Sequence, residues 1–302
     1  MKRMGNLRNR EQTNELDRRE FLLQSAVIMA PLTIAIPLQA ETLSPPVSRI
    51  GLITDLHFAD KAPAINRHYR ESLLKLREAG DVYRELEVSH IVELGDLVDA
   101  ADSVATEQGY LATIHRELRK IPGEKHYVLG NHCVDTLTKE EFLAGVGATR
   151  SFESFDESGF HFIILDTCFR SDGQPYGRRN FEWTDPNIPD EQIHWLEKDL
   201  ARTNLPVVVF VHQRLDVGAP YGVKNAHAVR EVLQKSGKVR AVFQGHSHKN
   251  DHQVIEGISY VTLVAMVEGA GPSNSAYSVL NLHSSGVLSL SGHRKQESYR
   301  WS

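Results

Sequence analysis

The sequence predicts an α/β fold, a single domain of two packed sheets flanked by helices. Short apolar runs typical of buried strands alternate with segments of helical periodicity over most of the chain. The chain has 302 residues, 41% of them hydrophobic, which is enough to bury a large core and excludes a disordered or fibrous chain. Polar residues of a few types follow several of the apolar runs, at the position where α/β sheets bind ligands.

The elements follow one another from residue 49 onward. The apolar run 49–54 predicts a strand that stops at Asp55, and leucines at 73, 74 and 76 open a helical pattern over residues 69–87. Further strands are predicted at 90–94, 126–129, 160–165, 207–211 and 239–243, and further helices at 104–119 and 189–202. The last predicted strands are antiparallel and lie at 257–263, 277–282 and 287–291.

Charge and cysteine content exclude several classes of protein. Lys and Arg total 34 against 39 Asp and Glu, a net charge of -5, so no polybasic surface for nucleic acid is evident. Cys133 and Cys168 are too few for a disulfide scaffold or a four-cysteine zinc site, and whether they pair with each other is left open. The 15 histidines are more than an average composition gives, which raises the question of whether they cluster.

The first forty residues differ in character from the rest. Basic residues and then Arg18-Arg19, followed by Phe21-Leu22, precede a weakly apolar run over 23–38. This order resembles a twin-arginine signal peptide, which implies the twin-arginine export machinery as a partner and a periplasmic or extracellular location. Pro31 and Pro37 interrupt the run, so no stable membrane span is expected in the mature protein. Cleavage is expected after Ala40, and the proline-containing residues 41–48 are expected to form a linker.

Ligand-type side chains gather in five short motifs at or near the ends of predicted strands. The motifs are Asp55-x-His57, Gly95-Asp96-x-x-Asp99, Gly130-Asn131-His132, His212 and Gly245-His246-x-His248. The carboxyl ends of parallel strands meet at one edge of a sheet, so these side chains are expected to lie together. Glycines at 95, 130 and 245 allow the backbone to turn tightly beside them.

In this order and spacing the five motifs resemble the calcineurin-like metallophosphoesterase family over about residues 49–295. The resemblance implies a four-layer α-β-β-α sandwich in one domain, 49–302, that binds two divalent ions. It assigns Asp96 as the bridging carboxylate, which two neighbouring cations need to screen their repulsion. It also assigns Asp55, His57 and His248 to one ion, and Asn131, His212 and His246 to the other. Imidazole, carboxylate and amide ligands suit Mn, Fe or Zn better than Ca or Mg.

The resemblance also implies a reaction and a catalytic residue. Metal-bound hydroxide would attack phosphorus, and His132 would stabilise or protonate the leaving oxygen. Asp99 is expected to orient a histidine rather than to bind metal. Cys133 stands where the family usually has an acidic residue, so the orientation of His132 is an open question.

The substrate is expected to be a phosphorylated small molecule. Arg67 and Arg70 could reach a phosphate oxygen, and the long polar segment 166–185 offers Tyr176, Phe181 and Trp183 for stacking on a base or sugar. Phosphomonoester hydrolysis is the first expectation, with phosphodiester or nucleotide-pyrophosphate hydrolysis as the alternative. The segment 166–185 resembles the branch of ADP-ribose and CDP-alcohol pyrophosphatases and exported alkaline-phosphatase-like enzymes.

A catalytically silent binding protein on the same fold is a further alternative, which the full set of seven ligand residues disfavours. Nine further histidines are expected to have surface or core roles. They are His90, His115, His126, His161, His194, His227, His252, His283 and His293.

Overall fold

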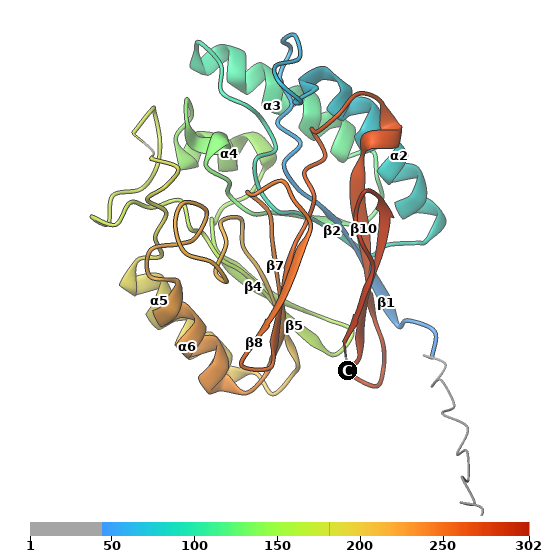
Figure 1. Ribbon diagram of the computed structural model, residues 1–302, viewed down its shortest axis with the longest axis vertical. Helices are drawn as coiled ribbons and strands as arrows, with labels where there is room; N and C mark the ends of the chain where they lie inside the picture. The colour runs from blue at the N-terminus through green and yellow to red at the C-terminus, as the bar shows by residue number, and fades with distance from the viewer. Residues whose placement is uncertain (1–43, 181, 302) are drawn as a thin grey trace, which may run out of the picture. The chain divides into compact units, whose positions relative to one another are not determined.

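A computed structural model describes residues 44–180 and 182–301. The segment 1–40, interpreted as a signal peptide, lies outside the described residues. The described chain contains two six-stranded sheets packed face to face, with helices on both outer sides (Figure 1). The predicted α/β class and the four-layer arrangement are confirmed.

The first sheet mixes parallel and antiparallel strands. In spatial order it contains β12 (Tyr299–Trp301), β11 (Leu288–Arg294), β10 (Ala276–Leu282), β1 (Ser48–Ile53), β2 (His90–Glu93) and β3 (Glu124–Tyr127). β1, β2 and β3 are mutually parallel, whereas β10 runs antiparallel to β1. Its outer face is covered by α2 (Ser72–Glu85), α3 (Val104–Leu118) and α4 (Lys139–Val146). Three single-turn helices lie in its loops: η1 (Tyr69–Glu71), η2 (His132–Val134) and η3 (Pro272–Asn274).

The second sheet has a parallel centre. In spatial order it contains β4 (Glu153–Glu157), β5 (Phe160–Ile164), β6 (Val207–Phe210), β7 (Val239–Gln244), β9 (Ile258–Thr262) and β8 (Asp251–Ile255). β5, β6, β7 and β9 are parallel, and the two outer strands pair antiparallel. Its outer face is covered by α5 (Asp190–Arg202) and α6 (Ala226–Ser236).

Apolar side chains fill the space between the two sheets. Leu52 and Val92 of the first sheet join Phe162, Phe210 and Phe243 of the second in one buried cluster. Both faces of the central strands are therefore covered, which is why those strands are nearly continuous apolar runs in the sequence. In the described part of the chain, no helix has the length and apolar character needed to cross a membrane.

The structure corrects several predicted elements. The run 257–263, expected to be antiparallel, forms β9, which lies parallel to β7. Apart from single-turn helices, two helices and three strands of the described chain were not predicted: α4, α6, β4, β8 and β12. Cys133 and Cys168 are both buried free thiols, so no disulfide joins them.

Candidate metal centre

The seven predicted metal ligands converge where loops from both sheets meet. Asp55 and His57 follow β1, Asp96 follows β2, Asn131 follows β3, His212 follows β6, and His246 and His248 follow β7. The ligand atoms of six of them form two groups, each with all atoms within 4.8 Å of one another, and His57 and Asp96 also form such a group with His132. One group contains Asp55, His57 and His248, and the other contains Asp96, His212 and His246.

Asp96 belongs to the second group and also contacts the first. Its Oδ2 atom is 3.5 Å from His57 Nε2 and 3.2 Å from His212 Nε2, which belong to different groups. Its Oδ1 atom accepts a hydrogen bond from the backbone N–H of His132 at 2.8 Å. One oxygen therefore faces both groups while the other fixes the carboxylate plane, which is the arrangement a bridging ligand requires.

Hydrogen bonds on the far side of two rings orient their Nε2 atoms inward. His212 Nδ1 donates to the carbonyl of Leu94 at 2.7 Å, and His248 Nδ1 lies 2.7 Å from Glu268 Oε1. Metal-binding histidines commonly have such a partner, because it fixes the tautomer and the ring plane. Lys75 is buried and donates to the carbonyl of Glu268 at 2.9 Å, so it helps to hold this loop in place.

Five of the seven predicted ligands have a strained backbone conformation. Positive φ angles occur at Asp55 (53°), His57 (43°), Asp96 (56°), His246 (68°) and His248 (59°). Non-glycine residues rarely adopt this left-handed region, and such strain concentrates at functional sites. The loops therefore turn sharply at these five residues.

The neighbouring glycines mainly permit close packing. Gly95 does have a positive φ of 103°, as a tight turn requires. A Cβ atom on Gly130 would lie 2.2 Å from Asp96 Oδ1, and one on Gly245 would lie 2.2 Å from Thr54 Oγ1. A Cβ atom on Gly95 would lie 2.4 Å from His212 Nδ1, so at all three glycines the loops pass too close for any side chain.

The residues fit a pair of divalent cations. Several buried ligand atoms lack a hydrogen-bond partner among the residues that the structure describes, namely Asp55 Oδ1, Asn131 Oδ1, His212 Nε2 and His246 Nε2. Buried polar atoms without partners are costly, and a cation supplies the missing interaction. Burial lowers the pKa of His57 to about 4 and that of His246 to about 3, so both imidazoles are neutral and can offer a lone pair at pH 7.

The other two histidines hold protons that a cation would displace. Burial lowers the pKa of His212, but the charge of Asp96 outweighs it and raises this pKa to about 9. Asp55 has the same effect on His248, whose pKa is also raised to about 9. Metal binding is therefore expected to release protons from these two rings, because a ligating imidazole must be unprotonated.

His132 lies beside the two groups and is oriented by Asp99. His132 Nδ1 is 2.9 Å from Asp99 Oδ1, and the His132 ring packs edge-on against His57 with centroids 4.7 Å apart. Burial opposes protonation, but Asp96 and Asp99 together raise the pKa of His132. The acid that holds His132 is thus Asp99, whereas Cys133 is buried in the core.

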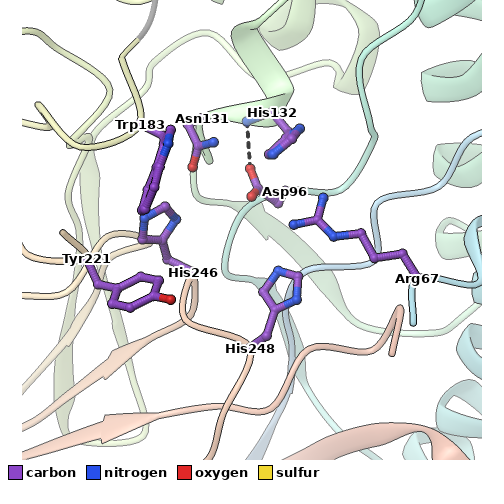
Figure 2. A pocket seen from close by; sticks show the side chains of 8 residues that line it. All are labelled: Arg67, Asp96, Asn131, His132, Trp183, Tyr221, His246 and His248. Atoms are coloured by element: carbon purple, nitrogen blue, oxygen red, sulfur yellow. Dashed lines mark hydrogen bonds between the residues drawn. The ribbon is translucent and has the colours of Figure 1, made fainter. Parts of the chain in front are cut away.

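The groups open into a pocket of about 360 Å³ (Figure 2). Besides ligands and His132, its lining includes Arg67, Trp183 and Tyr221. The Trp183 and Tyr221 rings stand beside His246, with centroids 6.1 and 5.9 Å from it, and are 40% and 41% exposed. Arg67 points toward Asp96 and His132 from the opposite side (Figure 2). The pocket therefore has an aromatic wall, a floor of ligands and a cationic side.

Two predicted substrate residues lie elsewhere. The Arg70 guanidinium is paired with Asp60 at 2.5 Å on the surface and does not line the pocket. Tyr176 is buried in the core beneath its loop, where its hydroxyl donates to the carbonyl of Glu182, so its ring faces cannot stack on a substrate. Of the predicted substrate residues, the structure brings Arg67 and Trp183 to the pocket, and Phe181 lies outside the described residues.

Sequence reasoning missed Tyr221 and Glu268. Tyr221 follows the Ala219-Pro220 cis peptide in the loop after β6, and Glu268 lies in the loop after β9. β9 runs parallel to β7, so its carboxyl end reaches the same sheet edge as His246 and His248. A parallel assignment of that strand would have pointed to Glu268.

Comparison with known proteins gives a consistent result. The sequence profile of the calcineurin-like phosphoesterases matches residues 48–250. A manganese-dependent ADP-ribose/CDP-alcohol diphosphatase from Arabidopsis thaliana is 22% identical over 303 residues, covering 84% of this chain and 96% of the plant protein. The Xenopus laevis protein of the same name is 28% identical over 317 residues, covering 81% and 88%. The crystal structure of a dimetal phosphatase from Danio rerio superposes with a TM-score of 0.75 at 21% identity, covering 84% of this chain and 98% of that one.

Proposed function

Because this chain belongs to the calcineurin-like phosphoesterase family, and is therefore a metal-dependent phosphoric ester hydrolase, we propose that it hydrolyses the diphosphate bond of nucleotide conjugates of the ADP-ribose or CDP-alcohol type. Water adds to one phosphorus and the other phosphate leaves, so the products are two phosphomonoesters. This proposal corresponds to the alternative reading of the sequence. The names of the curated relatives favour it over phosphomonoester hydrolysis.

The aromatic wall carries the proposal. Trp183 and Tyr221 are about two-fifths exposed beside His246, in a pocket whose size suits a small-molecule ligand. A simple phosphomonoester would need only the cations and Arg67, whereas a nucleotide also presents a flat base. Stacking on an aromatic side chain contributes roughly 1–3 kcal/mol per base, and burying an exposed ring against a base removes apolar surface from water.

The side chains then have separate roles. When bound, two divalent cations supply an activated water and neutralise the charge of the phosphoryl group. Arg67 reaches the remaining phosphate oxygens from the cationic side of the pocket. His132, positioned by Asp99, delivers a proton or a positive charge to the leaving oxygen.

A substrate panel tests the proposal. The wild-type enzyme with Mn²⁺ is assayed on ADP-ribose, CDP-choline and p-nitrophenyl phosphate, and the proposal expects the largest kcat/KM on the two nucleotides. Trp183→Ala should raise KM for both nucleotides roughly tenfold, with Trp183→Phe restoring most of it, since stacking needs a ring but not an indole.

Assaying Trp183→Ala on p-nitrophenyl phosphate provides the control. Its kcat/KM on p-nitrophenyl phosphate should change much less, because that ester has no base. A wild-type preference for p-nitrophenyl phosphate over both nucleotides would return the assignment to phosphomonoester hydrolysis.

A further inference from the structure

A second cluster of imidazole and carboxylate groups lies at the opposite ends of the strands from the pocket. His90 opens β2 and Glu124 opens β3, and His126 lies two residues further along β3. His90 Nδ1 is 3.0 Å from His126 Nε2 and 3.9 Å from Glu124 Oε2. Both histidines are buried, at 8% and 5% exposure, while the Glu124 side chain is 69% exposed.

The second sheet supplies partners for the outer side of each ring. His90 Nε2 lies 3.4 Å from Glu157 Oε2, and His126 Nδ1 lies 3.5 Å from Glu153 Oε1, both on the edge strand β4. Phe155, between them on β4, stacks on His126 with centroids 3.9 Å apart and planes at 6°. Each imidazole ring thus has one nitrogen facing a glutamate of β4 and the other nitrogen facing the second imidazole.

If both imidazoles are neutral, this arrangement is one proton or one cation short. Two neutral imidazoles carry only two N–H groups, yet three contacts require one: the contact between the rings and one to each glutamate. A cation between His90 Nδ1 and His126 Nε2 resolves the shortage, because it takes both lone pairs and leaves both N–H groups facing Glu157 and Glu153. This is the pattern of carboxylates behind metal-bound histidines.

We propose that His90, His126 and Glu124 form a third divalent-metal site, separate from the pocket and suited to Zn²⁺. Two imidazoles, one carboxylate and a water make a tetrahedral zinc shell, and ligands at about 2.0–2.1 Å place neighbouring nitrogens roughly 3.3 Å apart. The observed separation of 3.0 Å is close to that value. Glu124 is exposed, so its carboxylate can close on the ion without disturbing the core.

The site would connect the edges of the two sheets. Its ligands belong to β2 and β3 of the first sheet, and the carboxylates behind them belong to β4 of the second. An ion that binds the folded chain and not the unfolded one stabilises the fold by mass action. Zinc is therefore expected to raise the melting temperature through this site as well as to raise the metal content.

Total metal per chain is the direct test, because zinc can also exchange into the pocket. The full chain is loaded with Mn²⁺ and dialysed against Zn²⁺, and total manganese plus zinc is measured by mass spectrometry. The proposal expects one ion fewer in His126→Gln than in the wild type. Glu124→Gln and Glu153→Gln should each weaken the affinity of that ion about tenfold or more.

The matched control is His227→Gln, an exposed histidine beside Glu231 on α6, which should keep the wild-type metal content. Glu124→Gln decides the matter if His126→Gln does not fold, because Glu124 is mostly exposed. Equal zinc affinity in a titration and equal zinc-induced melting shifts in the wild type and Glu124→Gln would overturn the proposal and assign the cluster an extra shared proton instead. Neither readout depends on the substrate, so failure of the proposed function leaves this test intact.

Discussion

The two carboxylate oxygens of Asp96 have different partners, so no other side chain can easily replace Asp96. Oδ1 is held by the His132 backbone, and Oδ2 faces one histidine from each ligand group. Asp96→Asn keeps the shape but removes the charge that screens the repulsion between two cations. We expect kcat to fall by at least on the order of 10²–10³-fold, with metal lost and the circular dichroism spectrum unchanged.

The control for this variant is Asp102→Asn. Asp102 is an exposed acid in the same loop between β2 and α3, and its replacement should leave kcat and metal content unchanged. If Asp96→Asn holds two ions in the pocket and turns over at the wild-type rate, Asp96 is not the bridge.

His132 is the residue whose role depends most on the leaving group. It lies beside the ligand groups, with Nδ1 toward Asp99, and it lines the pocket. His132→Ala should lower kcat by roughly 10²–10⁴-fold when the leaving oxygen needs a proton. The measurement compares the methyl and p-nitrophenyl esters of one nucleoside monophosphate, because the nucleotide stays constant while the leaving group changes.

The loss should be largest for the methyl ester, since nitrophenolate leaves with little help. A ligand role for His132 predicts another pattern, in which metal content falls and both esters suffer equally. That pattern would remove His132 from acid catalysis.

At the scale of elements, the site depends on how closely the loops after β2 and β3 approach each other. A Cβ on Gly130 would overlap Asp96 at both Oδ1 and the backbone nitrogen, at 2.2 and 2.3 Å. Gly130→Ala must therefore push the two loops apart, and overpacking of this kind costs roughly 1–3 kcal/mol. We expect a lower melting temperature and weaker metal binding, measured by thermal denaturation and by metal titration.

Gly109→Ala is the matched control, because Gly109 is an exposed residue within α3 and a Cβ there meets nothing within 4 Å. That substitution should stabilise the chain by about 0.5–1 kcal/mol. Wild-type metal affinity in Gly130→Ala would show that the loops do not need this close approach.

The central strands could be predicted from the sequence because both of their faces are apolar and buried. The central strands are buried on both faces, so each is a nearly continuous apolar run that stops where a ligand begins. β4 was missed because its sequence, Glu-Ser-Phe-Asp-Glu, carries three acids and its place is set by pairing with β5. The helix α6 was missed because its buried face carries only Ala226, Val229 and Leu233. Val229 and Leu233 do have helical spacing, but two large apolar side chains are too few to mark a helix.

At the scale of the whole molecule, local motifs predicted which side chains converge at the candidate metal centre but not what surrounds them. Asp55-x-His57 and its counterparts are short, and each follows a recognisable strand. Glu268 reaches His248 only because β9 is parallel to β7, and Tyr221 reaches the pocket only through the path of its loop. Contacts of this kind depend on packing between distant segments, which no local pattern records.

The assembly of one site from both sheets has a consequence for export. Asp55 and Asp96 come from the first sheet and His246 and His248 from the second, so the ligands come together only in a folded chain. We propose that residues 1–40 direct export through the twin-arginine pathway, which the resemblance of Arg18-Arg19-x-Phe-Leu to that signal supports and which usually carries folded proteins.

Arg18-Arg19→Lys-Lys should leave the protein folded, active and uncleaved in the cytoplasm, because the arginine pair is read by a receptor whereas charge and hydrophobicity are unchanged. Cell fractionation and the size of the chain measure this outcome. The control replaces Arg8 and Arg10 by lysine, which preserves the same charge outside the pair and should not affect export. Unchanged export of the Lys-Lys variant would point to a general secretory route, in which the chain crosses unfolded and must bind its metals afterwards.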